Sequence, residues 1–202
     1  MNQAVVRLLE RPSVYLAWQR PFVGTKLDPV WRHNDRSTIR RVLDVGCGPG
    51  TNSSEFEGMD YLGVDLNPSY IAHARRHHTG QFAVADVRSD ALPGKGTYDF
   101  VLVNSLLHHL DDTSASSLLE SLRDCVSADG HVHVVELDLP EQRGLPRTLA
   151  LSDRGEYPRS LAAWRALLTK HFREVVFEPF PVPSRGPMLW SMLYFKGSLA
   201  GA

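Results

Sequence analysis

Cysteine is scarce in this chain of 202 residues, which contains only Cys47 and Cys125. The two are far apart and form no Cys-x-x-Cys pair, so neither a disulfide framework nor a zinc site built on thiolates is expected. A chain without such pairs suits a reducing compartment, and we expect a cytoplasmic protein.

Long apolar runs and an excess of one charge are also missing. No stretch approaches the roughly 20 apolar residues of a membrane span. Arg7, Glu10 and Arg11 interrupt the N-terminal region, where a signal peptide would need its apolar segment. The 22 Lys and Arg residues nearly balance the 23 Asp and Glu residues. Because this balance gives no general attraction to polyanions, we expect neither nucleic acid nor a membrane as a partner.

Short apolar segments alternate along the chain with segments of helical periodicity. We expect strands at residues 41–45, 61–66, 81–85, 98–103, 131–137, 173–180 and 188–195, and helices at 51–56, 68–77, 113–127 and 160–172. A helical turn is expected at 106–110, and loops at 140–160 and at the proline-rich 179–187. This alternation predicts an α/β fold with an open, mostly parallel sheet flanked by helices.

The same pattern predicts one domain spanning residues 1–202. Residues 1–36 read as an N-terminal helical cap, or lid, and residues 37–139 as a ligand-binding core. Residues 140–202 read as an insert followed by a C-terminal helix and two strands.

The most informative motif is Val42–Gly50, a buried strand that runs into a glycine-rich turn. Its glycines, Gly46, Gly48 and Gly50, let the turn adopt positive φ and bring backbone N–H groups close to a ligand. A dinucleotide fingerprint would be G-x-G-x-x-G, but position 51 is Thr. Asp44 also precedes the turn, and a carboxylate there suits an ammonium group better than a phosphate. Both features disfavour an NAD-binding oxidoreductase.

Acidic or amide side chains stand at or near the ends of five predicted strands: Asp44, Asp65, Asp86, Asn104 and Glu136. In open parallel sheets, ligands bind beyond the carboxyl ends of the strands. These residues are therefore expected to gather around one ligand.

Four segments carry a resemblance to the class I S-adenosylmethionine-dependent methyltransferases: Val42–Gly50, Gly63–Pro68, Ala85–Asp86 and Asn104–Leu110. Their order and spacing cover residues 40 to about 140. The resemblance implies a Rossmann-like sheet of seven strands with the seventh antiparallel. It also implies S-adenosylmethionine as the methyl donor, which leaves as S-adenosylhomocysteine.

The resemblance implies a role for each cofactor-binding position. Asp44 and the three glycines would hold the methionine end, Asp65 the ribose hydroxyls, and Asp86 the adenine amino group. The full predicted set is Asp44, Gly46, Cys47, Gly48, Gly50, Asn52, Asp65, Leu66, Asp86, Val87, Asn104 and Ser105. Leu66 would lie beside the adenine, Val87 would donate its backbone N–H to the ring, and Asn104 and Ser105 would flank the sulfonium. Other interpretations stay open: Asp65 as a helix cap, Asp86 as an exposed loop acid, and Cys47 as a packing residue.

Two adjacent histidines, His108 and His109, follow the fourth predicted strand. A helical turn separates them by about 100°, so only one can face a pocket well. Neutral histidine suits a general base near pH 7, and we expect one of the two to contact the acceptor or remove its proton. The alternative is a packing or capping histidine.

The acceptor site is expected to draw on two further segments. Tyr15, Trp18, Gln19 and Phe22 lie in the N-terminal lid, with core packing as the alternative. Arg154 and Tyr157 lie in the insert, in a polar cluster with Arg147, Asp153 and Arg159. One of these arginines would pair with an acceptor carboxylate or phosphate, and the alternative is a solvated loop.

Two motifs of the wider family are missing. The fourth strand ends in Asn104-Ser-Leu-Leu in place of Asn/Asp-Pro-Pro-Tyr/Phe, which argues against methylation of nucleobase nitrogens. Without an acidic cluster, no metal ion is expected. The sequence thus predicts methyl transfer to an oxygen, nitrogen or carbon of a small molecule. The alternatives are a tRNA or protein methyltransferase and a cofactor-binding protein without catalysis; the sequence does not indicate the oligomeric state.

Overall fold

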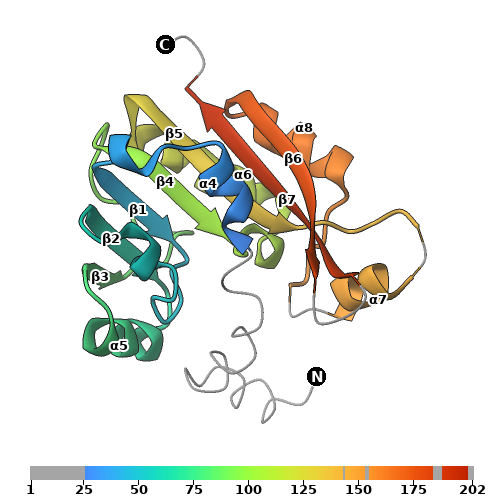
Figure 1. Ribbon diagram of the computed structural model, residues 1–202, viewed down its shortest axis with the longest axis horizontal. Helices are drawn as coiled ribbons and strands as arrows, with labels where there is room; N and C mark the ends of the chain where they lie inside the picture. The colour runs from blue at the N-terminus through green and yellow to red at the C-terminus, as the bar shows by residue number, and fades with distance from the viewer. Residues whose placement is uncertain (1–25, 143, 153–154, 184–187, 200–202) are drawn as a thin grey trace.

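The computed structural model describes residues 26–142, 144–152, 155–183 and 188–199, and it contains one seven-stranded sheet (Figure 1). The strands are β1 (Arg41–Val45), β2 (Asp60–Asp65), β3 (Gln81–Val84), β4 (Tyr98–Asn104), β5 (Val126–Leu137), β6 (Arg173–Pro183) and β7 (Met188–Ser198). They are ordered β3-β2-β1-β4-β5-β7-β6. Strands β1 to β5 pair in parallel, whereas β7 is antiparallel to β5 and β6. The predicted, mostly parallel sheet with an antiparallel seventh strand is confirmed.

The helices begin where the sequence supplies their caps. They are α4 (Asp28–Arg32), α5 (Pro68–His77), α6 (Asp112–Cys125), α7 (Leu145–Ser152) and α8 (Leu161–Thr169), with short 3-10 turns η1 (Arg36–Thr38), η2 (Ser53–Phe56) and η3 (Leu107–His109). Asn67 caps α5 ahead of Pro68, as predicted. Asp111 and Ser160 cap α6 and α8 by accepting hydrogen bonds from backbone N–H groups in the first turn. No helix among the described residues is both long enough and apolar enough to cross a membrane.

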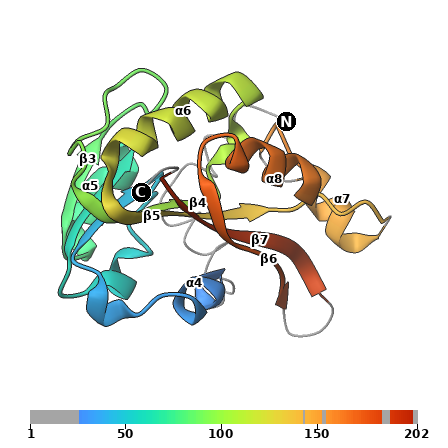
Figure 2. The same ribbon diagram turned by 90° about the horizontal axis from the view of Figure 1, so that it is seen from above.

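Two hydrophobic layers enclose the sheet because successive side chains of a strand point to opposite faces. Leu43 and Val101 pack with the buried residues of α6 and α8. Val42 and Leu102 pack with the buried residues of α4. Figure 2 shows α6 and α8 on one side of the sheet and α4 on the other. Because β1, β2 and β4 pair in parallel, their carboxyl ends lie at the same edge of the sheet, between these two layers.

Three predictions differ most from the structure, and the other predicted ends of helices and strands differ by at most three residues: for example, α6 ends at Cys125 and not at residue 127, and α8 at Thr169 and not at residue 172. Strand β5 begins at Val126 and not at residue 131, because Val126 already pairs with Tyr98 ahead of a register shift. The predicted loop at 140–160 contains helix α7, whose Ala150 is buried in the core. The predicted loop at 179–187 is strand through Pro183. Proline is tolerated there because β6 is an edge strand, where a missing N–H need not break a ladder.

Helix α6 offers a direct test of the core. Leu118 is 1% exposed in the layer beneath α6. Leu118→Ala should lower the free energy of unfolding by about 2–5 kcal/mol, because the side chain leaves a cavity in a close-packed layer. Ser117→Ala, at the exposed neighbouring position, should stay within about 0.5 kcal/mol of the wild type. Urea unfolding measures both, and an equal effect of the two substitutions would contradict the assigned faces of α6.

Candidate functional site

The glycine-rich turn after β1 is tied to the end of β2. Gly46 and Cys47 donate their backbone N–H groups to Val64 O at 2.8 and 3.0 Å. Gly46, Gly48 and Gly50 have φ values of 76°, 57° and 87°, in the left-handed region that favours glycine. The positive φ predicted for these glycines is confirmed. In this conformation the Gly48 N–H reaches the carboxylate of Asp65 at the end of β2.

Asp65, at the end of β2, holds this turn in place. Its Oδ2 accepts from the Gly48 N–H at 2.9 Å, and its Oδ1 accepts from the Asn67 N–H at 2.8 Å. Partial burial raises the pKa of this carboxyl. Asp65 does not cap α5, since Asn67 accepts from the first-turn N–H groups of that helix. Each Asp65 oxygen keeps a second lone pair, so the carboxylate can also accept from ribose hydroxyls.

Asp44 is fully buried and only partly satisfied. Its Oδ2 accepts from the Tyr61 hydroxyl at 2.7 Å and from Asn52 Nδ2 at 3.3 Å. Its Oδ1 has no hydrogen-bond partner. Burial raises the pKa of Asp44 to about 6, against the lowering effect of the Tyr61 and Asn52 bonds. A buried carboxylate oxygen without a donor is costly, so the site fits a cationic donor such as the methionine ammonium of the implied cofactor.

The predicted adenine contacts follow the ends of β2 and β3. Leu66 is 55% exposed beside Asp65, an apolar surface that a planar ring would cover. Asp86 accepts two hydrogen bonds from the Arg88 guanidinium, at 2.9 and 2.8 Å. The Arg88 bonds lower the pKa of Asp86 to about 2 and keep it ionised. Val87 is half-buried next to it.

The end of β4 carries backbone strain and a chain of polar side chains. Ser105 has φ of 56°, the one positive φ among non-glycine residues in the described ranges. Its hydroxyl donates to Asn104 Oδ1 at 3.1 Å, and Asn104 Nδ2 donates to Asn52 Oδ1 at 3.4 Å. Lys26 Nζ donates to the Ser105 hydroxyl at 3.5 Å. Sequence reasoning missed Lys26 as a site residue, because no motif distinguishes it from the other N-terminal basic residues.

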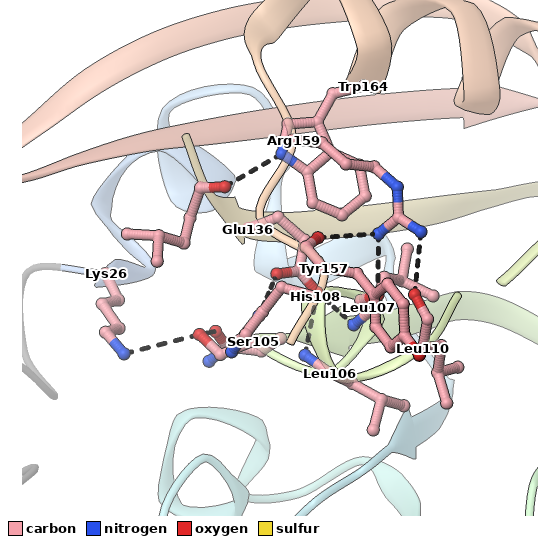
Figure 3. A network of polar contacts seen from close by, with 12 residues as sticks. Lys26, Ser105, Leu106, Leu107, His108, Leu110, Glu136, Tyr157, Arg159 and Trp164 are labelled. Atoms are coloured by element: carbon pink, nitrogen blue, oxygen red, sulfur yellow. Dashed lines mark hydrogen bonds and ion pairs between the residues drawn. The ribbon is translucent and has the colours of Figure 1, made fainter. Parts of the chain in front are cut away.

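The two histidines after β4 differ sharply in environment, and Figure 3 shows the surroundings of His108. His108 is 4% exposed, and its Nδ1 lies 2.7 Å from Oε2 of the buried Glu136. The other Glu136 oxygen accepts from the backbone N–H groups of Leu106 and Leu107. His109 is exposed. Glu136 thus orients His108 and holds the turn on which it lies.

The insert is fastened to the same turn by Arg159 (Figure 3). Its guanidinium donates to Leu107 O at 3.0 Å and to Leu110 O at 2.8 Å, and it lies 4.9 Å from the Trp164 ring. Tyr157, which is 40% exposed, donates its backbone N–H to His108 O at 3.0 Å. Because the Arg159 guanidinium is committed to these carbonyls, it is not the arginine that would meet an acceptor anion.

The backbone of the insert also lies directly against His108. A Cβ added to Gly155 would fall 2.0 Å from Cδ2 of His108. The other predicted acceptor residues, Tyr15, Trp18, Gln19, Phe22 and Arg154, lie outside the described residues. Within the described part of the chain, no group of three or more His, Cys, Asp or Glu side chains is arranged to hold a metal ion.

Comparison with known proteins agrees with this geometry. A family described as a methyltransferase domain matches residues 15–179. The ubiquinone biosynthesis O-methyltransferase of Acinetobacter baylyi is 31% identical over 102 residues, covering 46% of this chain and 42% of that protein. The Vibrio cholerae protein of the same name is 34% identical over 100 residues, covering 46% and 40%. The match therefore spans about two fifths of the length of these curated relatives.

Solved structures share the fold at low identity. A SAM-dependent methyltransferase from Methanosarcina mazei has a TM-score of 0.69 at 19% identity, covering 85% of this chain and 97% of that one. Human N-acetylserotonin methyltransferase, solved with SAM, has a TM-score of 0.63 at 21% identity, covering 91% of this chain and 59% of that one. The family match over residues 15–179 shows that this chain belongs to the methyltransferase-domain family, and it shares its fold with SAM-dependent methyltransferases of known structure.

Proposed function

We propose that this protein transfers the methyl group of S-adenosylmethionine to an oxygen atom of a small-molecule acceptor. The observation that carries the proposal is the buried Asp44 carboxylate, one oxygen of which lacks a donor beside the glycine-rich turn. Oxygen as the acceptor atom is supported by the curated relatives, which are named as O-methyltransferases.

The chain's residues divide the binding of the cofactor among three strands. Asp44 accepts from its ammonium group, Asp65 from its ribose hydroxyls, and Leu66 and Asp86 receive the adenine. When bound, the cofactor supplies a sulfonium whose methyl group is already activated for displacement. The protein then has to align the acceptor, exclude water and, for a hydroxyl acceptor, take up a proton.

His108 is the proposed proton acceptor. Its Nδ1 faces Glu136 at 2.7 Å, which holds the ring orientation, and Nε2 is the nitrogen that we propose acts as the base. The backbone N–H groups of Leu106 and Leu107 both donate to Oε1 of Glu136 and keep its carboxylate in place. Residues of the insert cover this histidine, so we infer that the acceptor binds beneath the insert and the N-terminal lid, where Tyr15, Trp18, Gln19, Phe22, Arg154 and Tyr157 would contact it.

Replacing the buried acid tests the cofactor site. Asp44→Asn should weaken S-adenosylhomocysteine binding by about 10- to 100-fold, because a hydrogen bond to a charged group is worth about 1.5–3 kcal/mol. Isothermal titration calorimetry at pH 7.5 measures the effect. Asp60→Asn, at the exposed start of β2, is the matched control and should bind like the wild type. Unchanged affinity in Asp44→Asn would rule out the assigned role of Asp44.

Replacing each histidine in turn tests the proposed base. His108→Gln should lower kcat by about 10²- to 10⁴-fold, the usual contribution of a general base, while S-adenosylhomocysteine affinity stays within about twofold. His109→Gln, on the exposed side of the turn, should keep its activity. The assay follows labelled methyl transfer to a panel of phenols and catechols. A larger loss in His109→Gln would reverse the assignment, and no transfer by the wild type to any member would contradict a phenolic acceptor.

A further inference from the structure

The start of β2 places a tyrosine next to the partly satisfied carboxylate of β1. In the parallel register, Val42 pairs with Tyr61 and Asp44 pairs with Gly63. Gly63 has no side chain, and a Cβ there would lie 2.8 Å from Cys47 Sγ. The Tyr61 side chain therefore reaches Asp44 diagonally across the two strands.

The ring of Tyr61 is held by apolar neighbours on the same face of the sheet. It is 3% exposed, with the ring of Phe56 at 5.8 Å and that of Phe82 at 5.7 Å. Burial raises the pKa of Tyr61 well above its ordinary value, so the hydroxyl remains a donor. A fixed ring with a protonated hydroxyl gives Asp44 a donor of constant direction.

The two hydrogen bonds that Asp44 accepts go to the same carboxylate oxygen. The Tyr61 hydroxyl and Asn52 Nδ2 both bond to Oδ2. Asn52 in turn accepts from Asn104, and Asn104 accepts from Ser105, so the chain reaches the end of β4. With Oδ2 occupied twice, Oδ1 is the oxygen left to accept from a ligand.

We propose that Tyr61 is a positioning residue of the cofactor site, whose hydroxyl holds the Asp44 carboxylate so that Oδ1 accepts from the ammonium group of the cofactor. This inference rests on the proposed cofactor role of Asp44. Tyr61 itself does not touch the cofactor; it acts through Asp44. Its aromatic ring contributes to packing, whereas its hydroxyl contributes to binding.

The role of the hydroxyl has a pH signature. Burial raises the pKa of Asp44 to about 6, and the Tyr61 bond is the largest influence that lowers it. An ionised carboxylate binds an ammonium better than a protonated one, so affinity is present above this pKa and is lost as the pH falls through it. Removing the hydroxyl raises the pKa of Asp44 and moves that loss to higher pH.

Other groups facing Asp44 do not produce the same signature. Apart from Tyr61 itself, these groups are Asp65 at the end of β2 and Cys47 in the glycine-rich turn. Burial raises the pKa of the Cys47 thiol far above neutrality, so Cys47 stays protonated. Burial also raises the pKa of Asp65, but the hydrogen bonds of that carboxylate go to Gly48 and Asn67 and not to Tyr61. Loss of the Tyr61 hydroxyl should therefore act directly on the Asp44 titration, because Tyr61 bonds to Asp44 and makes no hydrogen bond to Asp65.

The test is S-adenosylhomocysteine affinity between pH 5 and pH 8, measured by calorimetry on the full chain. Wild-type affinity should decline below about pH 6, the pKa of Asp44. In Tyr61→Phe the decline should begin about one pH unit higher, as expected for loss of one hydrogen bond to a carboxylate. Tyr98→Phe removes a hydroxyl at the opposite end of β4 and should follow the wild-type curve.

Each outcome decides a separate point. If Tyr61→Phe binds with the wild-type pH midpoint, the positioning role is wrong while the cofactor assignment stands. If the wild type itself does not bind S-adenosylhomocysteine, the cofactor role of Asp44 fails first and this inference with it. Thermal unfolding checks that Tyr61→Phe is folded. Should it not fold, Asn52→Ala removes the second bond to the same oxygen and should shift the midpoint in the same direction by a smaller amount.

Discussion

The buried Asp44 carboxylate is the constraint on which the cofactor side of the molecule depends. Removing a carboxylate from water is costly, and hydrogen bonds offset the cost only where they are made. Tyr61 and Asn52 satisfy one oxygen and leave the other without a donor. Glu136 is equally buried at the end of β5, but both of its oxygens have partners. The two buried acids therefore differ: Asp44 keeps one oxygen without a hydrogen-bond donor, which suits the proposed ligand, whereas Glu136 uses both oxygens within the chain.

Glu136 and Arg159 hold the His108 turn from its two ends. The carboxylate accepts from N–H groups at the start of the turn, and the guanidinium donates to carbonyls in the turn and just after it. A turn of this length has too few internal hydrogen bonds to define its own conformation. Glu136 and Arg159 supply the hydrogen bonds that fix the conformation of this turn. Arg159 belongs to the insert, so its bonds connect the segment expected to cover the acceptor to the turn that carries the proposed base.

Much of the fold was predictable because short apolar runs and capping residues are local properties of the sequence. The first four strands, α5 with its Asn67 cap and the positive φ of the three glycines follow the sequence closely. Errors arose where tertiary contacts override local preference. The prolines of residues 179–183 read as a loop until their place on an edge strand is known. Helix α7 packs on β7, a contact that the polar, turn-rich sequence of this segment does not predict.

The sequence by itself determined the family, the glycine-rich turn and the acids that follow the strands, because each of these depends on residue type at fixed spacing. It could not decide which oxygen of Asp44 is open, which histidine is buried, or that Arg159 is committed to carbonyls of the His108 turn. Those outcomes depend on partners far apart in the chain, such as Glu136 for His108 and Leu107 for Arg159. Only the parallel register of β1 and β2, which places Tyr61 diagonal to Asp44, brought the tyrosine into the site.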